Sequence, residues 1–298
     1  MKESISRSVG ALIGLAIGDA LGAPVEFKPR GSFDEINGYI SGGQFNLPAG
    51  AWTDDTAMAM CLGQSLLSNN GFSSKDLLKR FCDWVEKGEN TSTGLAIGIG
   101  QNTLRTLGEF KRSGKLKAEK FGSKNDGNGA LMRIAPIPIF YQNDIDLAII
   151  NAREQSYTTH ASIISAECCA YCSFIMVLLI EGVPWKKALS STSELKWGKE
   201  ISSLVNFEWR EKSYQDLSAS GYVLASLEAS LWCVENSRSF SEAVLLAVNL
   251  GDDADTVGAI TGQLAGALYG YSNIENKFLE KLIKRPIIFS LSQNLCSR

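Results

Sequence analysis

The chain has 298 residues, and its 29 Lys and Arg against 32 Asp and Glu give a formal net charge of −3. Hydrophobic residues make up 45 % and charged residues 20 %, which is typical of a folded protein and excludes a disordered or fibrous one. The near-neutral charge argues against a general nucleic-acid binder, and the single histidine, His160, excludes a metal site that needs two or three imidazoles.

Helical periodicity dominates the sequence, and alternating strand patterns are scarce. Segment 73–88 is a clear case, with Ser73 or Ser74 as the N-cap, one apolar stripe, and Gly88 at the end. Segment 239–250 follows the same pattern. The sequence therefore predicts helices over residues 4–22, 53–69, 73–88, 93–109, 145–157, 161–181, 221–236, 239–250, 254–270 and 275–284.

No linker rich in Pro or Ser and no charge block divides the chain, so we predict one compact all-α, multi-helix domain over residues 1–298. The stretches 23–52 and 121–138 are rich in Gly and Pro and are expected to be non-helical. The basic run from Lys111 to Lys124 is best explained as a solvated helix end and loop, with a binding patch as the alternative. We expect a monomer.

The N-terminus allows two interpretations. Basic residues precede an apolar run, as in a signal peptide, but Asp19 falls within the same pattern, which favours a core helix. No stretch reaches about 18 uninterrupted apolar residues, so no membrane span is predicted. The seven cysteines are odd in number and scattered, which favours free thiols in the cytoplasm. The pair Cys169 and Cys172 leaves a zinc site as a minor alternative.

Two helices carry glycine at every fourth position. An interior glycine costs a helix about 0.5–1 kcal/mol relative to alanine, so eight of them need a compensating role. Close approach between helix backbones is the usual one, and we predict a tightly packed core there. The glycines are Gly10, Gly14, Gly18 and Gly22 in the first helix and Gly258, Gly262, Gly266 and Gly270 in the second.

Acidic residues gather at two predicted helix starts. One start reads Thr53-Asp54-Asp55-Thr56 and the other reads Asp252-Asp253-Ala254-Asp255-Thr256. Helix capping explains one or two such side chains at each start. Five carboxylates repel one another and raise one another's pKa unless a cation lies among them. Oxygen ligands without Cys or His point to Mg²⁺, Mn²⁺ or Ca²⁺, and two metals are plausible if the motifs meet.

Further candidates lie between these two motifs. The turn from Asp126 to Arg133 has glycines at alternate positions and could present backbone N–H groups to an anion such as a phosphate. It lacks the lysine and serine of a P-loop. His160 follows two threonines, and a lone histidine is more often structural than catalytic.

Taken in chain order, these motifs resemble those of the ADP-ribosylglycohydrolase family, of the dinitrogenase-reductase-activating and ADP-ribosylarginine hydrolase type. The resemblance spans residues 10–270, nearly the whole chain, and the two acidic motifs with the glycine turn between them are quite specific. The matching pieces are Gly14-Leu15-Ala16-Ile17-Gly18-Asp19-Ala20-Leu21-Gly22, Glu26, Trp52-Thr53-Asp54-Asp55-Thr56, Gly127-Asn128-Gly129-Ala130-Leu131-Met132-Arg133, Thr159-His160, and Gly251 to Gly266.

The resemblance implies an all-α fold with two Mg²⁺ or Mn²⁺ ions in a central cleft. It implies that the metals are held by Thr53, Asp54, Asp55, Asp253, Asp255 and Thr256. It also implies that the Gly127–Arg133 turn holds the diphosphate of the substrate and that His160 lies beside the ribose. The substrate-binding residues that it implies are Glu26, Gly100, Gly127, Asn128, Gly129, Met132 and His160.

Two positions depart from the family pattern. Some members have an Asp where this chain has Gly98, so a role of that Asp is lost here. Many members have a second Gly where this chain has Asp252, which could cap the helix or lie behind the metal ligands.

The resemblance leaves the linkage open. The leading hypothesis is a metal-dependent hydrolase that frees ADP-ribose from arginine on a protein, with Asp54 or Asp55 as the catalytic base. The alternatives are a hydrolase of serine-linked or O-acetyl-ADP-ribose, and a toxin-immunity or binding protein that uses the same cleft. A carboxylate is preferred to His160 as the group that protonates the leaving arginine.

Overall fold

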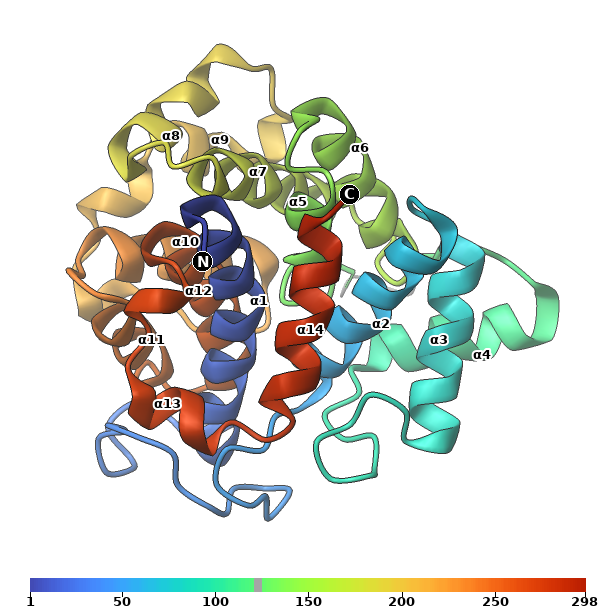
Figure 1. The fold of residues 1–298 in the computed structure, drawn as a ribbon, viewed down its shortest axis with the longest axis horizontal. Coiled ribbons are helices and arrows are strands. Elements are labelled where there is room, and N and C mark those ends of the chain that lie inside the picture. Colours follow the sequence, from blue (N-terminus) through green and yellow to red (C-terminus); the bar gives the residue numbers. More distant parts are fainter. Residues whose placement is uncertain (121–124) are drawn as a thin grey trace.

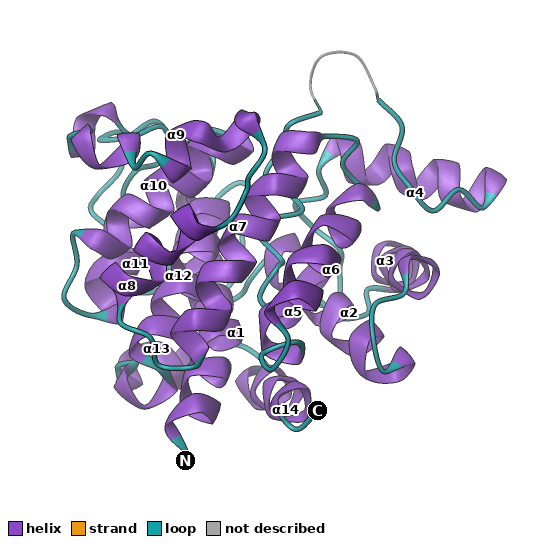
Figure 2. Ribbon diagram, turned by 90° about the horizontal axis from the view of Figure 1, so that it is seen from above, coloured by secondary structure: helices purple, strands orange, loops and turns teal. Residues whose placement is uncertain are grey.

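The computed structural model describes residues 1–120 and 125–298, and this part of the chain is helical without any strand (Figure 2). The all-α prediction is therefore confirmed, with about 63 % helix. The described α-helices are α1 Glu3–Gly22, α2 Asp54–Asn69, α3 Ser74–Lys87, α4 Gln101–Ser113, α5 Pro136–Phe140, α6 Ile145–Tyr157, α7 Ile163–Ile180, α8 Trp185–Ser191, α9 Ser202–Val205, α10 Val223–Glu235, α11 Phe240–Val248, α12 Ala254–Tyr269, α13 Asn276–Lys281 and α14 Arg285–Cys296.

Most predicted helices match within two residues, but the prediction for 93–109 is wrong at its start. Helix α4 begins only at Gln101. Gly94 and Gly98 take φ angles of +95° and +80°, which a right-handed helix does not allow. The segment before α4 is therefore an irregular strap.

Helices that start with proline were missed. The whole stretch 121–138 is expected to be non-helical, yet Pro136 opens α5. Residues 121–124 of this stretch lie outside the described chain. Pro286 lies in the first turn of α14, and Pro184 precedes α8. Proline lacks an N–H that the first turn would leave unpaired anyway, so it starts helices as readily as it ends them.

The glycine stripes of α1 and α12 face each other, as predicted. The two helices run side by side in opposite directions through the centre of the molecule (Figure 1). A Cβ atom at Gly18 would lie 1.9 Å from the carbonyl oxygen of Gly258, and one at Gly262 would lie 2.0 Å from that of Gly14. Only glycine permits this separation. Gly270 is the exception, because it ends α12 with a φ of +79°.

Both long apolar helices belong to the core. By length and composition, Glu3–Val25 and Ile163–Ile180 would suffice to cross a membrane, but 100 % and 78 % of their apolar windows are buried by the rest of the chain. Core helices pass the same test, so this is weak evidence for a membrane segment. The buried position of α1 agrees with the core interpretation of the N-terminal run.

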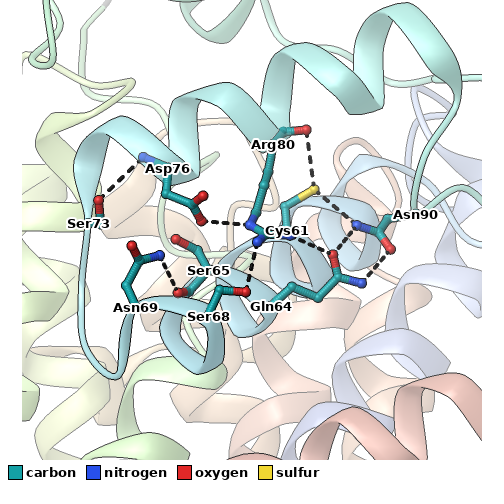
Figure 3. Close-up of polar contacts among 9 residues, drawn as sticks. All are labelled: Cys61, Gln64, Ser65, Ser68, Asn69, Ser73, Asp76, Arg80 and Asn90. Carbon is teal, nitrogen blue, oxygen red and sulfur yellow. Dashed lines mark hydrogen bonds and ion pairs between the residues drawn. The ribbon is translucent and has the colours of Figure 1, made fainter.

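Helix α2, which carries one acidic motif at its start, is held at its other end by a polar network with α3 (Figure 3). Arg80 donates to Asp76 at 2.7 Å on its own helix and to Ser68 Oγ at 2.9 Å on α2. Gln64 and Asn90 exchange two hydrogen bonds of 2.9 Å. On its remaining side, α14 packs between α1 and α2 (Figure 1).

The basic run behaves as a solvated surface. Lys115 pairs with Glu119 at 2.5 Å and Lys117 pairs with Glu154 at 2.9 Å, all with exposed side chains. Lys124 lies outside the described residues.

The cysteines give no support to the zinc alternative. Burial raises the pKa of the Cys169 thiol to about 12, and no candidate metal group in the described chain includes a cysteine.

We predict that Gly262→Ala destabilises the fold by about 1–3 kcal/mol, because the added methyl group would overlap the backbone of α1. Urea denaturation measures the change. The matched control is Gly108→Ala in α4, where an added Cβ meets nothing within 4 Å. Helix propensity alone should stabilise the control by about 0.5–1 kcal/mol. Equal changes in both variants would contradict the close-contact explanation.

Candidate metal centre and substrate pocket

Asp19 joins the two acidic helix starts. It lies near the C-terminal end of α1, where the antiparallel contact brings it beside the start of α12. Its carboxylate accepts hydrogen bonds from the backbone N–H of Thr53 at 2.9 Å and of Thr56 at 3.0 Å. The hydroxyls of the same threonines donate at 2.8 and 2.6 Å. Asp19 therefore fixes the N-terminus of α2 against α1.

Capping does not explain the acidic motifs. Thr53 is the N-cap of α2 and Asp253 is the N-cap of α12, yet neither side chain makes a capping hydrogen bond. Thr53 donates to Asp19 instead, and Asp253 accepts from Asn128 Nδ2 at 2.6 Å. By contrast, Ser73 caps α3 as predicted. The acids at these two starts are thus free to serve another purpose.

Two groups of carboxylates in the described chain could each hold a metal ion. Within each group the candidate ligand atoms all lie within 4.8 Å of one another, and Asp255 belongs to both. One group is Asp19, Asp55 and Asp255, and the other is Glu26, Asp253 and Asp255. Both oxygens of Asp19 already accept hydrogen bonds, so it serves the first group mainly by positioning its neighbours.

The donor atoms fit a hard divalent cation. Asp55 Oδ1 and Glu26 Oε2 are buried and have no hydrogen-bond partner within the described residues. Burial, together with neighbouring carboxylates, raises the pKa of Asp55 and Asp255 well above the ordinary value, and that of Glu26 to about 10. A buried anion without a partner is costly, and a cation coordinated by oxygen removes that cost.

Asp54 differs from the other acids. It belongs to neither candidate metal group, and its carboxylate lines the open pocket with 7 % of the residue exposed. A Cβ atom at Gly98 would lie 2.2 Å from Asp54 Oδ1. The strap before α4 therefore passes directly over Asp54, and the Asp that some family members have at this position has no room here.

The acids form one wall of a cavity of about 310 Å³. Of the predicted site residues, only Thr53 and Asp55 are absent from its lining, because they lie beneath it. The residues brought together are Glu26, Asp54, Gly100, Gly127, Asn128, Gly129, Met132, His160, Asp253, Asp255 and Thr256. Five further residues line the pocket that sequence reasoning did not select for the site, and Gly98 was noted only as a departure from the family pattern. They belong to irregular segments or to the start of α4: Phe27, Gly98, Gln101, Asn102 and Thr103.

The glycine turn lies directly against the ring of His160, and both line the pocket. A Cβ at Gly129 would lie 3.0 Å from His160 Cε1, so glycine allows the turn to approach the ring edge this closely. Arg133, at the end of the turn, is fully buried and does not line the pocket. Burial and the nearby Arg133 lower the pKa of His160 to about 3, so the imidazole is neutral.

The second departure from the family pattern has a backbone explanation. Asp252 takes a φ of +52°, a conformation that favours Gly and that Asp tolerates. Its carbonyl accepts from the Phe27 N–H at 2.6 Å, and its N–H donates to the Lys28 carbonyl at 2.8 Å. Asp252 thus joins the pocket rim to α12 through its backbone, with its side chain exposed, and it does not cap the helix.

Comparisons with known proteins agree with this geometry. The sequence model of the ADP-ribosylglycohydrolase family matches residues 1–298. The chain belongs to the ADP-ribosylglycohydrolase family. It is 39 % identical to the ADP-ribosylarginine hydrolase Tri1 of Serratia proteamaculans, over 98 % of this chain and 80 % of the relative. It is 29 % identical to the ADP-ribosyl-[dinitrogen reductase] glycohydrolase of Rhodospirillum rubrum, over 93 % and 90 %.

A solved structure shares the fold throughout. The ADP-ribosylglycohydrolase-related protein complex aligns with a TM-score of 0.88 and 36 % identity, over 100 % of this chain and 99 % of that one. The family and fold implied by the sequence motifs are therefore confirmed.

For the metal centre we predict a crossover in thermal stability with Asp255→Asn. In EDTA the variant should melt above the wild type, because one of the repelling carboxylates is gone. In saturating Mg²⁺ it should melt below the wild type, because a ligand at 100-fold its Kd stabilises the native state by about 2.7 kcal/mol.

Asp252→Asn is the matched control, since its side chain is exposed and belongs to neither carboxylate group, and Asn tolerates the same backbone angle. It should follow the wild type in both buffers. An equal Mg²⁺-induced rise in Tm for the wild type and Asp255→Asn would count against the assignment of Asp255.

Proposed function

We propose that this protein hydrolyses the N-glycosidic bond between ADP-ribose and an arginine side chain of a protein, and so reverses mono-ADP-ribosylation. The observation that carries the proposal is an oxygen-only acid cluster that opens into a pocket walled by a glycine turn and a neutral histidine. The names of the Tri1 relatives favour arginine among the possible linkages.

We propose two Mg²⁺ or Mn²⁺ ions, held by Thr53, Asp54, Asp55, Asp253, Asp255 and Thr256. The hydroxyl of Thr53 lies 3.4 Å from both Asp55 Oδ2 and Asp255 Oδ2, so it is central to the cluster. When bound, the ions would stabilise negative charge that develops on oxygens of the ribose. The geometry also makes Glu26 a candidate ligand, beyond its proposed contact with substrate.

Asp54 is the better candidate for the general base. It lies outside both metal groups and on the pocket surface, whereas Asp55 is buried beneath with 1 % exposed. A carboxylate that is not fully engaged with metal keeps an oxygen that can accept a proton from water. The water oxygen then bonds to the anomeric carbon as the bond from that carbon to the arginine nitrogen breaks.

The leaving arginine is a strong base and must depart protonated. The proton that Asp54 accepts from water can pass to the departing nitrogen, which balances the reaction and restores the carboxylate. His160 has no proton to spare for this step, because its neutral ring would have to become an anion. The products are ADP-ribose and the unmodified arginine side chain.

The glycine turn is proposed to hold the diphosphate. Gly127 and Gly129 line the pocket without side chains, and the Asn128 amide is fixed by hydrogen bonds to Asp253 and to Ser226 Oγ at 2.9 Å. The partner that we propose is a mono-ADP-ribosylated protein, and the location that we propose is the cytoplasm.

The decisive experiment offers Mg²⁺ and three substrates to the protein: ADP-ribosylated arginine, ADP-ribosylated serine and O-acetyl-ADP-ribose. We expect ADP-ribose to be released fastest from arginine. Faster release from serine or from the acetyl ester would assign that linkage to the protein in place of arginine. Binding of all three substrates without release would indicate a binding or immunity protein.

Among variants, we expect Asp54→Asn to lower kcat by about 10²- to 10⁴-fold, which is typical for loss of a general acid–base group. His160→Ala should cost less than about 100-fold, because a neutral histidine contributes binding and orientation. Steady-state kinetics with ADP-ribosylarginine would measure both, and Asp252→Asn should retain wild-type activity. Loss of all turnover in His160→Ala with intact metal binding would assign the proton to the histidine.

A further inference from the structure

Arg133 is a buried cation without an acidic partner. It is fully buried and makes no ion pair with any described residue. Its guanidinium donates to Gln155 Oε1 at 3.0 Å and to the Gln155 carbonyl at 3.1 Å, and it stacks 4.8 Å from the centre of the Phe81 ring. Burying a charge in this way is costly, so a compensating role is expected.

The same guanidinium contacts the glycine turn and the residue that precedes His160. Nη1 donates to the carbonyl of Gly129 at 3.2 Å, and Nη2 donates to Thr159 Oγ1 at 2.9 Å. Thr159 Oγ1 in turn lies 2.9 Å from His160 Nδ1. Arg133 is therefore linked to the glycine turn directly and to the imidazole through one hydroxyl.

The donors and acceptors in this series of hydrogen bonds determine which atom donates each proton. A guanidinium only donates, so the Thr159 oxygen must accept from Arg133. The hydroxyl has one proton to give, and His160 Nδ1 is its other hydrogen-bond partner within the described chain. With a proton on Nδ1, two donors would meet on one oxygen and the hydroxyl proton would have no acceptor.

We propose that Arg133 is a positioning residue that acts through Thr159 to hold His160 as the neutral tautomer with its proton on Nε2. This inference rests on the proposed function only in assigning the pocket to the substrate. The Nε2–Cε1 edge lies close to Gly127 and Gly129, and all three residues line the pocket. His160 thus presents a fixed N–H donor to an oxygen of the ligand, such as a ribose hydroxyl or a phosphate oxygen.

The single histidine makes the test direct. Protein labelled with ¹⁵N-histidine gives two ring-nitrogen signals, and Nε2 is recognised because it couples to both carbon-bound ring protons. We expect a protonated Nε2 and an unprotonated Nδ1 in the wild type at pH 7. A proton on Nδ1, or a doubly protonated ring, would overturn the proposal. No substrate is needed, so this outcome is independent of which linkage is cleaved.

Two variants test the relay, by which we mean the hydrogen bonds that run from Arg133 through Thr159 to His160. Thr159→Val keeps the shape but removes the hydroxyl, and Arg133→Met removes the donor. Each should let the proton populate both ring nitrogens and should lower kcat/KM about 2- to 10-fold, as for loss of one hydrogen bond. Thr159→Ser should restore both the tautomer and the rate.

A Thr159→Val protein whose tautomer or kcat/KM matches the wild type would overturn the relay. Because Arg133→Met could fail to fold, circular dichroism is recorded for each variant. Thr159→Val alone decides the outcome if Arg133→Met is unfolded.

Discussion

The close backbone contact between α1 and α12 is the constraint on which the site depends. Because facing glycines bring the helices within contact of each other's carbonyl oxygens, the end of α1 meets the start of α12 with little freedom. Asp19 lies at that meeting point and also binds the start of α2. Three helix ends are thereby fixed around one small volume, and acids that would otherwise repel one another are kept within coordination distance.

This arrangement places a destabilising cluster on a rigid support. Buried carboxylates without a cation favour separation or protonation, and their raised pKa values reflect that. A flexible support would relax and scatter the ligands, whereas two tightly packed helices cannot move apart without losing the core between them. The glycines lower helix propensity, but they supply the stiffness that a preformed metal site needs.

The sequence was sufficient for the parts of the fold and site that depend on local chemistry. Regular periodicity and good N-caps identified most helices, and crowded acids at two helix starts pointed to the candidate metal centre. The strap at Gly98 and the helix opened by Pro136 escaped prediction because glycine and proline have two opposite local uses. The roles of Asp19 and Arg133 escaped because their hydrogen-bond partners lie more than twenty residues away or in other elements.

The charges of the pocket divide the chemistry between two walls. On one wall, the two carboxylate groups could hold cations, and Asp54 lines the pocket outside both groups. On the other, burial and the nearby guanidinium of Arg133 lower the pKa of His160, so the neutral ring would neither act as an acid nor repel the proposed cations. A charged imidazole facing two divalent ions across a cavity of about 310 Å³ would weaken both. A neutral donor on this wall is therefore the arrangement that is compatible with metals on the other.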